Sequence, residues 1–231
     1  MIAVVSDIHA NLEALEAVLA DIARRGISKV YCLGDIVGLG PDPRPCLEIA
    51  QSFDVCLSGN WDFFIAGNGD TQSHRSKSEL RFWYEHARNV LTRSQLDFLN
   101  GNPSILCDCG VTYAHGDPLD SVNGCLFPES ISDTDFMERV FDSFAGVFVC
   151  GHTHIAGVFS PSRFDEWSQF GNKTITHFQS SIINCGSVGQ PRDGDARACY
   201  VVQTGSQFQF VRVPYDERKF HRKMQRLNLF T

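Results

Sequence analysis

The first 60 residues alternate short apolar segments with amphipathic ones, and this order restricts the fold more than any other feature of the chain. Apolar runs rich in β-branched residues predict strands at residues 2–6, 29–33 and 54–57. Between them, apolar residues recur at helical spacing from Leu12 to Ile22 behind Asn11, a favoured N-cap type, and a second helix opens at Pro43 and runs to about residue 52. This βαβαβ order predicts a parallel sheet covered by helices.

The rest of the chain has a more helical middle and a β-rich second half. We expect helices at residues 78–91, 94–100, 134–143 and 215–227. We expect further strands at residues 105–107, 111–115, 147–150, 155–160, 174–179, 182–185, 199–203 and 208–213. Ser94 and Asp97 resemble a capping box at the start of the second of these helices. No repeat, charge block or linker divides the chain, so we expect residues 1–231 to form a single α/β (α+β) domain with two sheets.

The composition excludes some classes of function. The chain is 43% apolar and 20% charged, as in ordinary globular proteins, and its net charge is −7. This acidity argues against a protein that coats nucleic acid or binds membrane surfaces, because both need basic patches. The N-terminus lacks the basic segment of a signal peptide and no apolar run reaches 18 residues, so we expect a cytoplasmic protein. A homo-oligomer is compatible with the sequence.

The nine cysteines are an odd number, and most of them lie in apolar runs. We expect small buried hydrophobic side chains in a reducing compartment rather than a disulfide framework. Cys107 and Cys109 could hold a metal, but no second cysteine pair stands near them at zinc-site spacing.

Five short clusters of polar residues each follow a predicted strand. They are Ser6-Asp7-Ile8-His9, Gly34-Asp35, Gly59-Asn60-Trp61-Asp62, His115-Gly116 and Gly151-His152-Thr153-His154. Ligands bind at the carboxyl ends of strands in α/β sheets, and glycine there permits close backbone approach. Taken singly, most of the clusters are typical of turns, exposed polar residues or a hydrogen-bonded histidine, although the pair His152 and His154 favours a metal.

Taken together, the clusters supply more donors than one metal ion needs. Four nitrogen and three oxygen donors come from Asp7, His9, Asp35, Asn60, His115, His152 and His154. Two ions that share a bridging carboxylate account for all seven. Without a thiolate in the set, Mn²⁺, Fe or Zn²⁺ fits best. Such a pair, about 3.5–4 Å apart, clamps the attacking and leaving oxygens of a phosphoryl displacement.

In this order the clusters resemble the calcineurin-like metallophosphoesterases, and most of all a branch of small single-domain members from bacteria and archaea. The same branch shares the opening Ser-Asp-Ile-His-x-Asn-Leu-Glu-Ala-Leu and the stretches at residues 32–43, 186–195 and 212–216. The likeness runs from residue 2 to about residue 216, nearly the whole chain.

The resemblance implies a four-layer αββα sandwich of two mixed β-sheets, with the site between the sheets. It implies a first metal on Asp7, His9, Asp35 and His154, and a second on Asp35, Asn60, His115 and His152. A hydroxide that bridges the metals would attack phosphorus without a covalent enzyme intermediate. The catalytic set would be Asp35, Asn60, His115 and Asp62. The expected substrates are phosphodiesters or nucleotide-type phosphates.

One departure from the family concerns the leaving group. The family usually reads Gly-Asn-His-Asp or Gly-Asn-His-Glu, where the histidine helps to protonate or stabilise the leaving group, but this chain has Trp61. Indole cannot donate a proton at working pH, and loss of a general acid costs about 10²–10⁴ in rate. Trp61 could stack on a nucleobase, although packing in the core is commoner. His74 and His86 are candidate substitutes for the missing acid.

The remaining expectations concern substrate contacts, two small substitutions and a second function. Asn60, Trp61 and Arg192 are the candidate substrate-binding residues, and the alternative for Arg192 is an ion pair with Asp193 or Asp195 that braces its loop.

Ala10 and Cys185 replace a usual glycine and proline, with expected consequences for packing only. A weakly active or inactive binding or scaffold protein with this fold is the alternative function, and Trp61 favours it.

Overall fold

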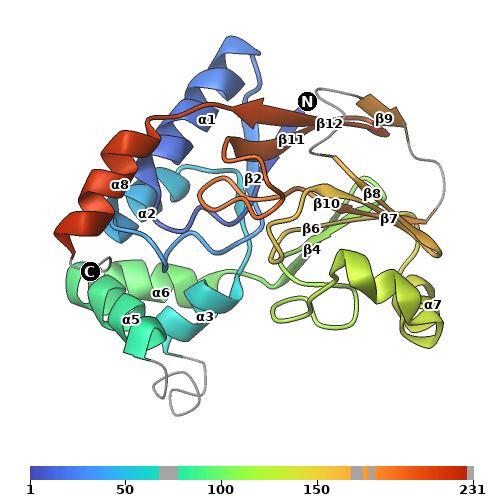
Figure 1. The fold of residues 1–231 in the computed structure, drawn as a ribbon, viewed down its shortest axis with the longest axis horizontal. Helices are drawn as coiled ribbons and strands as arrows, with labels where there is room; N and C mark the ends of the chain where they lie inside the picture. Colours follow the sequence, from blue (N-terminus) through green and yellow to red (C-terminus); the bar gives the residue numbers. More distant parts are fainter. Residues whose placement is uncertain (68–77, 168–173, 177–179, 228–231) are drawn as a thin grey trace.

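The computed structural model describes residues 1–67, 78–167, 174–176 and 180–227. Two six-stranded mixed sheets lie face to face, with helices on their outer sides (Figure 1). The layers therefore run helix, sheet, sheet, helix, as the family resemblance implied.

The first sheet contains the βαβαβ unit of the N-terminus. Its strand order is β3-β2-β1-β11-β12-β9. The strands are β1 (Ile2–Val5), β2 (Lys29–Cys32), β3 (Val55–Cys56), β9 (Thr174–Thr176), β11 (Ala198–Thr204) and β12 (Gln207–Val213). The first three are parallel, which confirms the prediction, and β11 joins β1 in antiparallel orientation. The helices of this half are α1 (Leu12–Arg24), α2 (Pro43–Ala50), α3 (Asn60–Ala66), α5 (Ser78–Val90), α6 (Arg93–Gly101) and α8 (Glu217–Arg226).

The second sheet is built from the middle of the chain. Its strand order is β4-β5-β6-β10-β7-β8. The strands are β4 (Ile105–Asp108), β5 (Val111–Ala114), β6 (Val147–Cys150), β7 (Gly157–Ser160), β8 (Arg163–Glu166) and β10 (Ser181–Asn184). A 3₁₀ helix (Pro128–Ser132) and α7 (Thr134–Asp142) lie on its outer side. Parallel pairing of β5, β6 and β10 places their carboxyl ends at one edge.

Three clusters of buried side chains fill the spaces between the layers. Along β1, Ala3 and Val5 face the helices while Val4 faces the other sheet. This alternation follows from the two-residue period of a strand. Tyr113 and Val149 reach the same inter-sheet core from the second sheet, and α7 packs Met137 onto that sheet's outer face. Burial on both faces explains why the strands read as continuous apolar runs.

The helix caps agree with the prediction at one helix and differ from it at another. Asn11 caps α1 as expected, since its Oδ1 accepts from the Ala14 N–H at 3.1 Å. The capping box expected at Ser94 is wrong. The hydroxyl of Thr92 accepts from the Gln95 N–H, and the Gln95 side chain accepts from the Thr92 N–H. The sequence did not suggest α3, β8 or the 3₁₀ helix, and residues 177–179 of an expected strand lie outside the described part of the chain.

Five of the nine cysteines are buried and all nine are free thiols, as the sequence suggested. Cys107 and Cys109 are exposed near the β4–β5 turn and belong to none of the candidate metal groups found among the described residues. No helix in the described part of the chain has the length and apolarity needed to cross a membrane.

Candidate metal centre

The seven predicted ligands lie on the segments that follow five strands, at the facing carboxyl ends of the two sheets. Asp7 and His9 follow β1, Asp35 follows β2, Asn60 follows β3, His115 follows β5, and His152 and His154 follow β6. The structure brings these side chains together although Asp7 and His154 lie 147 positions apart in sequence. Six of them form two groups of three, and within each group the ligand atoms all lie within 4.8 Å of one another.

The first group contains Asp7, His9 and His154. The Nε2 atoms of His9 and His154 are 3.0 Å apart, and His154 Nε2 is 3.2 Å from Asp7 Oδ1. The other nitrogen of His154, Nδ1, lies 2.7 Å from the Gln190 carbonyl oxygen, to which it donates in the neutral ring. That hydrogen bond leaves a lone pair on Nε2, which faces the centre, as metal-binding histidines require.

The second group contains Asp35, His115 and His152, with Asn60 beside it. His115 Nε2 is 2.9 Å from His152 Nδ1, 3.0 Å from Asn60 Oδ1 and 3.5 Å from Asp35 Oδ2. Asp35 Oδ2 is also 3.6 Å from Nε2 of His9, in the first group. Asp35 therefore lies between the two groups.

The charges of the site suit cations. Burial lowers the pKa of His9 well below its ordinary value and that of His115 to about 3, so both rings are neutral near pH 7. Burial and then the charges of Asp7 and Asp62 raise the pKa of Asp35. Asp7 Oδ1 is buried without a hydrogen-bond partner among the described residues. Neutral imidazoles therefore surround carboxylates that have no positively charged partner in the described part of the chain. Such a site fits divalent ions, whose charge would favour the ionised form of the carboxylates.

The backbone of the site adopts conformations that are unusual for residues other than glycine. Asp7, His9, Asp35, His152 and His154 have φ angles of 54°, 46°, 52°, 67° and 63°. Left-handed conformations cost energy in residues other than glycine, so they persist only where the surrounding structure holds them, and they cluster at functional sites. Backbone hydrogen bonds do so here, from Asp7 N–H to the Gly34 carbonyl and from His9 N–H to the Asp35 carbonyl, at 3.1 and 2.9 Å.

The alanine that replaces the family's glycine at position 10 shares this conformation. Its φ is 51°, so the substitution affects the backbone and not only packing, contrary to our expectation. Ala10 donates its N–H to the Ile36 carbonyl at 3.0 Å and accepts at its carbonyl from the Asp42 N–H at 3.0 Å. Cys185 is buried and raises no comparable conflict.

Two glycines permit the close approach of ligand-bearing segments. A Cβ atom on Gly59 would lie 2.1 Å from Asp35 Oδ1, and one on Gly151 would lie 2.5 Å from Asp7 Oδ2. Asn184 holds the second of these segments, since its Nδ2 donates to the Gly151 carbonyl at 2.6 Å and to Thr153 Oγ1 at 2.9 Å. Sequence reasoning missed Asn184, although only Cys185 separates it from the tail motif of the resemblance.

Asp62 lies behind Asp35 rather than among the ligands. Its carboxylate accepts from the N–H groups of Ile36, Val37 and Gly59 at 3.0, 3.2 and 3.4 Å. Burial raises its pKa to about 7 although these bonds favour the charged form. These contacts are those of a residue that positions the segment carrying Asp35.

Trp61 packs in the core, which is the commoner of the two arrangements considered for it. Its side chain is largely buried, lies edge-on to Phe64 with ring centroids 6.0 Å apart, and covers Gly38. With Asn60, Phe64 and Leu80, it also lines a cavity of about 180 Å³. Its backbone N–H donates to Asp35 Oδ1 at 2.8 Å.

Of the two histidines considered as a substitute acid, the structure describes only His86. His86 Nε2 lies 3.1 Å from the Pro41 carbonyl and belongs to neither ligand group. His74 lies outside the described residues.

Arg192 lies near the centre without the ion pair that we considered for it. Its guanidinium donates to Gln190 Oε1 at 2.9 Å, whereas Asp193 pairs with Arg212 and Asp195 pairs with Arg197. Burial is the main cause that lowers the pKa of His9 and His152, and the charge of Arg192 lowers both further. Arg192 is exposed, so its positive charge acts on the two ligand groups from the solvent-facing rim of the candidate centre.

Comparisons with known proteins show what this chain is similar to in sequence and fold. The sequence profile of the calcineurin-like phosphoesterase superfamily domain matches residues 1–207. An uncharacterised protein of Methanocaldococcus jannaschii is 36% identical over 97% of this chain and 91% of its own. The crystal structure of a metallophosphoesterase from Sphaerobacter thermophilus aligns with a TM-score of 0.85 and 29% identity, covering 99% of this chain and 95% of the other. A hypothetical protein from Pyrococcus horikoshii shares the fold, with a TM-score of 0.73 and 22% identity over 100% and 95% of the chains.

Proposed function

Because this chain belongs to the calcineurin-like phosphoesterase superfamily, we propose that it hydrolyses phosphodiesters or nucleotide-type phosphates with two metal ions. The observation that carries the proposal is the position of Asp35, whose Oδ2 is 3.6 Å from His9 Nε2 in one ligand group and 3.5 Å from His115 Nε2 in the other. A carboxylate oxygen between two sets of imidazole nitrogens suits a shared ligand of two cations.

The seven side chains divide between the two ions. Asp7, His9, Asp35 and His154 would hold the first, and Asp35, Asn60, His115 and His152 would hold the second. When bound, the ions supply positive charge for the phosphate and lower the pKa of water towards 7. Nitrogen and oxygen donors without a thiolate suit Mn²⁺, Fe or Zn²⁺.

The chain's own residues bind and orient the substrate. Arg192 on the rim supplies a guanidinium for a phosphate oxygen, and the amide of Asn60 retains N–H groups that can donate to another. Trp61 leaves the site without the family's proton donor, so esters with good leaving groups react fastest. The chain's net charge of −7 opposes nucleic-acid polymers, but bound ions dominate the local field that a small anionic substrate meets.

A second candidate function is a metal-dependent binding or scaffold protein without appreciable turnover. Trp61 favours it, because tryptophan stands where the family usually has its leaving-group histidine. The complete set of seven ligand side chains favours the enzyme.

Hydrolysis of bis-p-nitrophenyl phosphate by the Mn²⁺-loaded protein tests the proposal. Asp35→Asn should lower kcat/KM by more than about a hundredfold, since loss of even an indirect metal contact costs 10–100-fold. Asp97→Asn makes the same change at an exposed carboxylate on α6 and should leave the rate unchanged. A wild-type protein that holds two ions yet turns over no tested ester faster than Asp35→Asn would reject the enzyme and favour the binding protein.

A further inference from the structure

A cavity of about 270 Å³ adjoins the metal centre. His9, a proposed metal ligand, lines it together with Leu39, Pro191 and residues of α8. Ligand pockets span roughly 300–1,000 Å³, so this cavity suits a single small ring system rather than a polymer. His9 belongs both to the cavity and to the candidate metal centre. A group bound in the cavity would therefore lie next to the phosphate of the proposed substrate.

One face of α8 forms a wall of this cavity. Glu217, Phe220, His221 and Met224 all line it, and their spacing of three, four and seven residues places them on one side of a helix. Phe220 and Met224 also pack against the large core beneath the helices. The wall therefore joins the core on one side and presents polar groups to the cavity on the other.

Ion pairs on the neighbouring face hold α8 in place. Lys219 and Lys223 lie 3.1 and 2.6 Å from Glu13 Oε1 on α1, and Lys223 also lies 2.6 Å from Asp42 Oδ2 at the start of α2. Glu13 is buried, so these pairs are only partly screened by water. A wall fixed in this way needs little reordering when a ligand binds.

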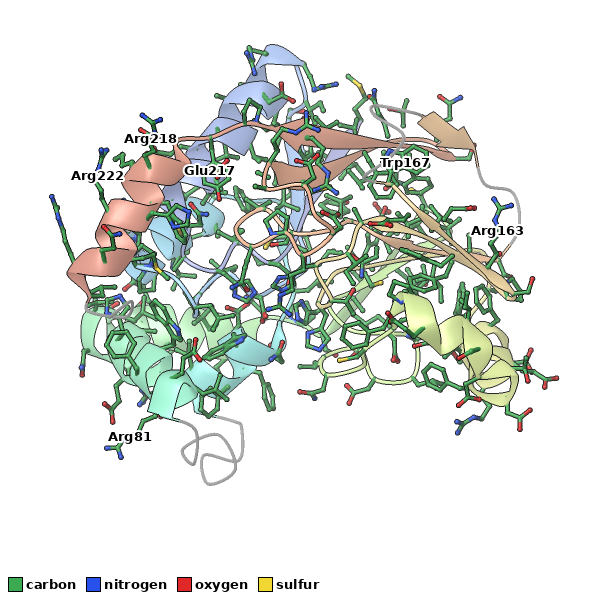
Figure 2. The ribbon with its side chains drawn as sticks, viewed as in Figure 1. Arg81, Arg163, Trp167, Glu217, Arg218 and Arg222 are labelled. Atoms are coloured by element: carbon green, nitrogen blue, oxygen red, sulfur yellow. The ribbon has the colours of Figure 1, made fainter. Side chains whose placement is uncertain are left out.

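The carboxylate of Glu217 has no hydrogen bond or ion pair with any residue that the structure describes, and this determines what the cavity accepts. The basic residues Arg218 and Arg222 project from the outer side of α8, as Figure 2 shows, and leave Glu217 uncompensated. A carboxylate beside the centre repels phosphate but accepts hydrogen bonds from N–H groups. The apolar surfaces of Leu39, Pro191 and Phe220 suit the face of a flat ring.

Building on the proposed phosphoesterase function, we propose that this cavity binds the base of a nucleotide substrate and prefers a base with an exocyclic amino group, such as adenine. Phe220 and Pro191 contact the ring, and Glu217 accepts a hydrogen bond from the amino group. Uracil presents carbonyl oxygens on both sides of its ring N–H, and the Glu217 carboxylate disfavours them.

Three p-nitrophenyl esters with the same reacting group test this preference. They are the esters of adenosine 5′-phosphate, uridine 5′-phosphate and methyl ribofuranoside 5-phosphate, the last of which has no base. The wild-type protein with Mn²⁺ should show the highest kcat/KM for the adenosine ester. Glu217→Gln should lower that value about tenfold, as expected for a hydrogen bond to a charged group, and change the base-free ester less than twofold. Glu16→Gln, the same change at an exposed site on α1, should alter none of the three.

Binding of adenosine to the metal-free protein, measured by calorimetry, separates the cavity from the chemistry. Adenosine should bind to the wild type and to Glu16→Gln, and about tenfold more weakly to Glu217→Gln. If adenosine binds in this pattern but no ester is hydrolysed, the cavity is supported and the phosphoesterase function fails. If the three esters react equally and adenosine does not bind, the cavity's role is overturned while the phosphoesterase function stands.

Discussion

The Nε2 atoms of His9 and His154 lie 3.0 Å apart, although 145 positions separate the two residues in sequence. Both imidazoles belong to one ligand group, and the Nδ1 of His154 lies 2.7 Å from the Gln190 carbonyl oxygen, which orients its Nε2 towards the centre. Two ring nitrogens held this close in a buried site suit a shared metal ion better than a hydrogen bond alone.

Single ligand variants should lose one of two ions. His154→Gln removes a nitrogen from the first group and His152→Gln removes one from the second, so each should retain about one ion per chain after dialysis. Metal analysis by plasma mass spectrometry measures this directly. His86→Gln, outside both groups, should keep the wild-type content. Wild-type content in both ligand variants would contradict the assignment.

Gly151→Ala should disturb the centre through packing. The added Cβ would lie 2.2 Å from Ser6 Oγ and 2.5 Å from Asp7 Oδ2, so one segment must move. We expect a loss of about 1–3 kcal/mol in the free energy of unfolding, measured with urea, and weaker metal binding.

Gly101→Ala is the matched control, because a Cβ there meets nothing within 4 Å. It should change stability by less than about 1 kcal/mol and leave metal binding unchanged. Equal behaviour of the two variants would show that close approach at Gly151 is not required.

Trp61→His should restore a proton donor. We expect the rate to rise by about 10–100-fold on esters with poor leaving groups, such as phenyl esters, and little on p-nitrophenyl esters. Because Trp61 packs against Phe64 and Gly38, the variant should also lose about 1–3 kcal/mol of stability.

Trp61→Phe makes a similar packing change without supplying an acid. Its rates should not rise on either class of ester. A gain of the same size for all substrates, or for both variants, would show that the indole limits the reaction by a route other than the missing acid.

Acid should weaken the attachment of α8. Burial raises the pKa of Glu13, but Lys223 and Lys219 outweigh it and hold that pKa below the ordinary value. A lowered pKa means that the stabilisation is complete above the unfolded-state value, about 4.3, and is lost as the pH falls through the folded-state value. Glu13→Gln should therefore lose about 1–3 kcal/mol at pH 7, and its difference from the wild type should shrink towards pH 3.

Urea unfolding at pH 7 and pH 3 measures this difference. Glu16→Gln, at an exposed position on the same helix, should match the wild type at both values. A deficit of Glu13→Gln that is as large at pH 3 as at pH 7 would mean that packing, rather than charge, holds α8.

The sequence predicts the parts of this structure that depend on local periodicity. The parallel strands β1, β2 and β3 and the helices between them follow from apolar spacing. The candidate ligands follow from polar residues at strand ends. What it could not show depends on contacts between distant segments. Arg192 bonds to Gln190 instead of forming the ion pair considered for it, and one face of α8 lines a cavity with His9. Both contacts depend on how separate segments meet in the fold.

The capping box of α6 shows that sequence patterns leave alternatives open even for neighbouring residues. Ser94 with Asp97 and Thr92 with Gln95 both fit the pattern, and the hydrogen bonds in the structure select the second. Backbone strain was also hidden, because nothing in the sequence indicates that Asp7 and Asp35 adopt left-handed conformations.

Anomalous scattering from a crystal soaked in Mn²⁺ tests the central claim most directly. We expect two peaks about 3.5–4 Å apart. One should lie within the group of Asp7, His9 and His154, the other within the group of Asp35, His115 and His152, and Asp35 should contact both. A single peak, or two peaks that Asp35 does not bridge, would contradict the dinuclear centre.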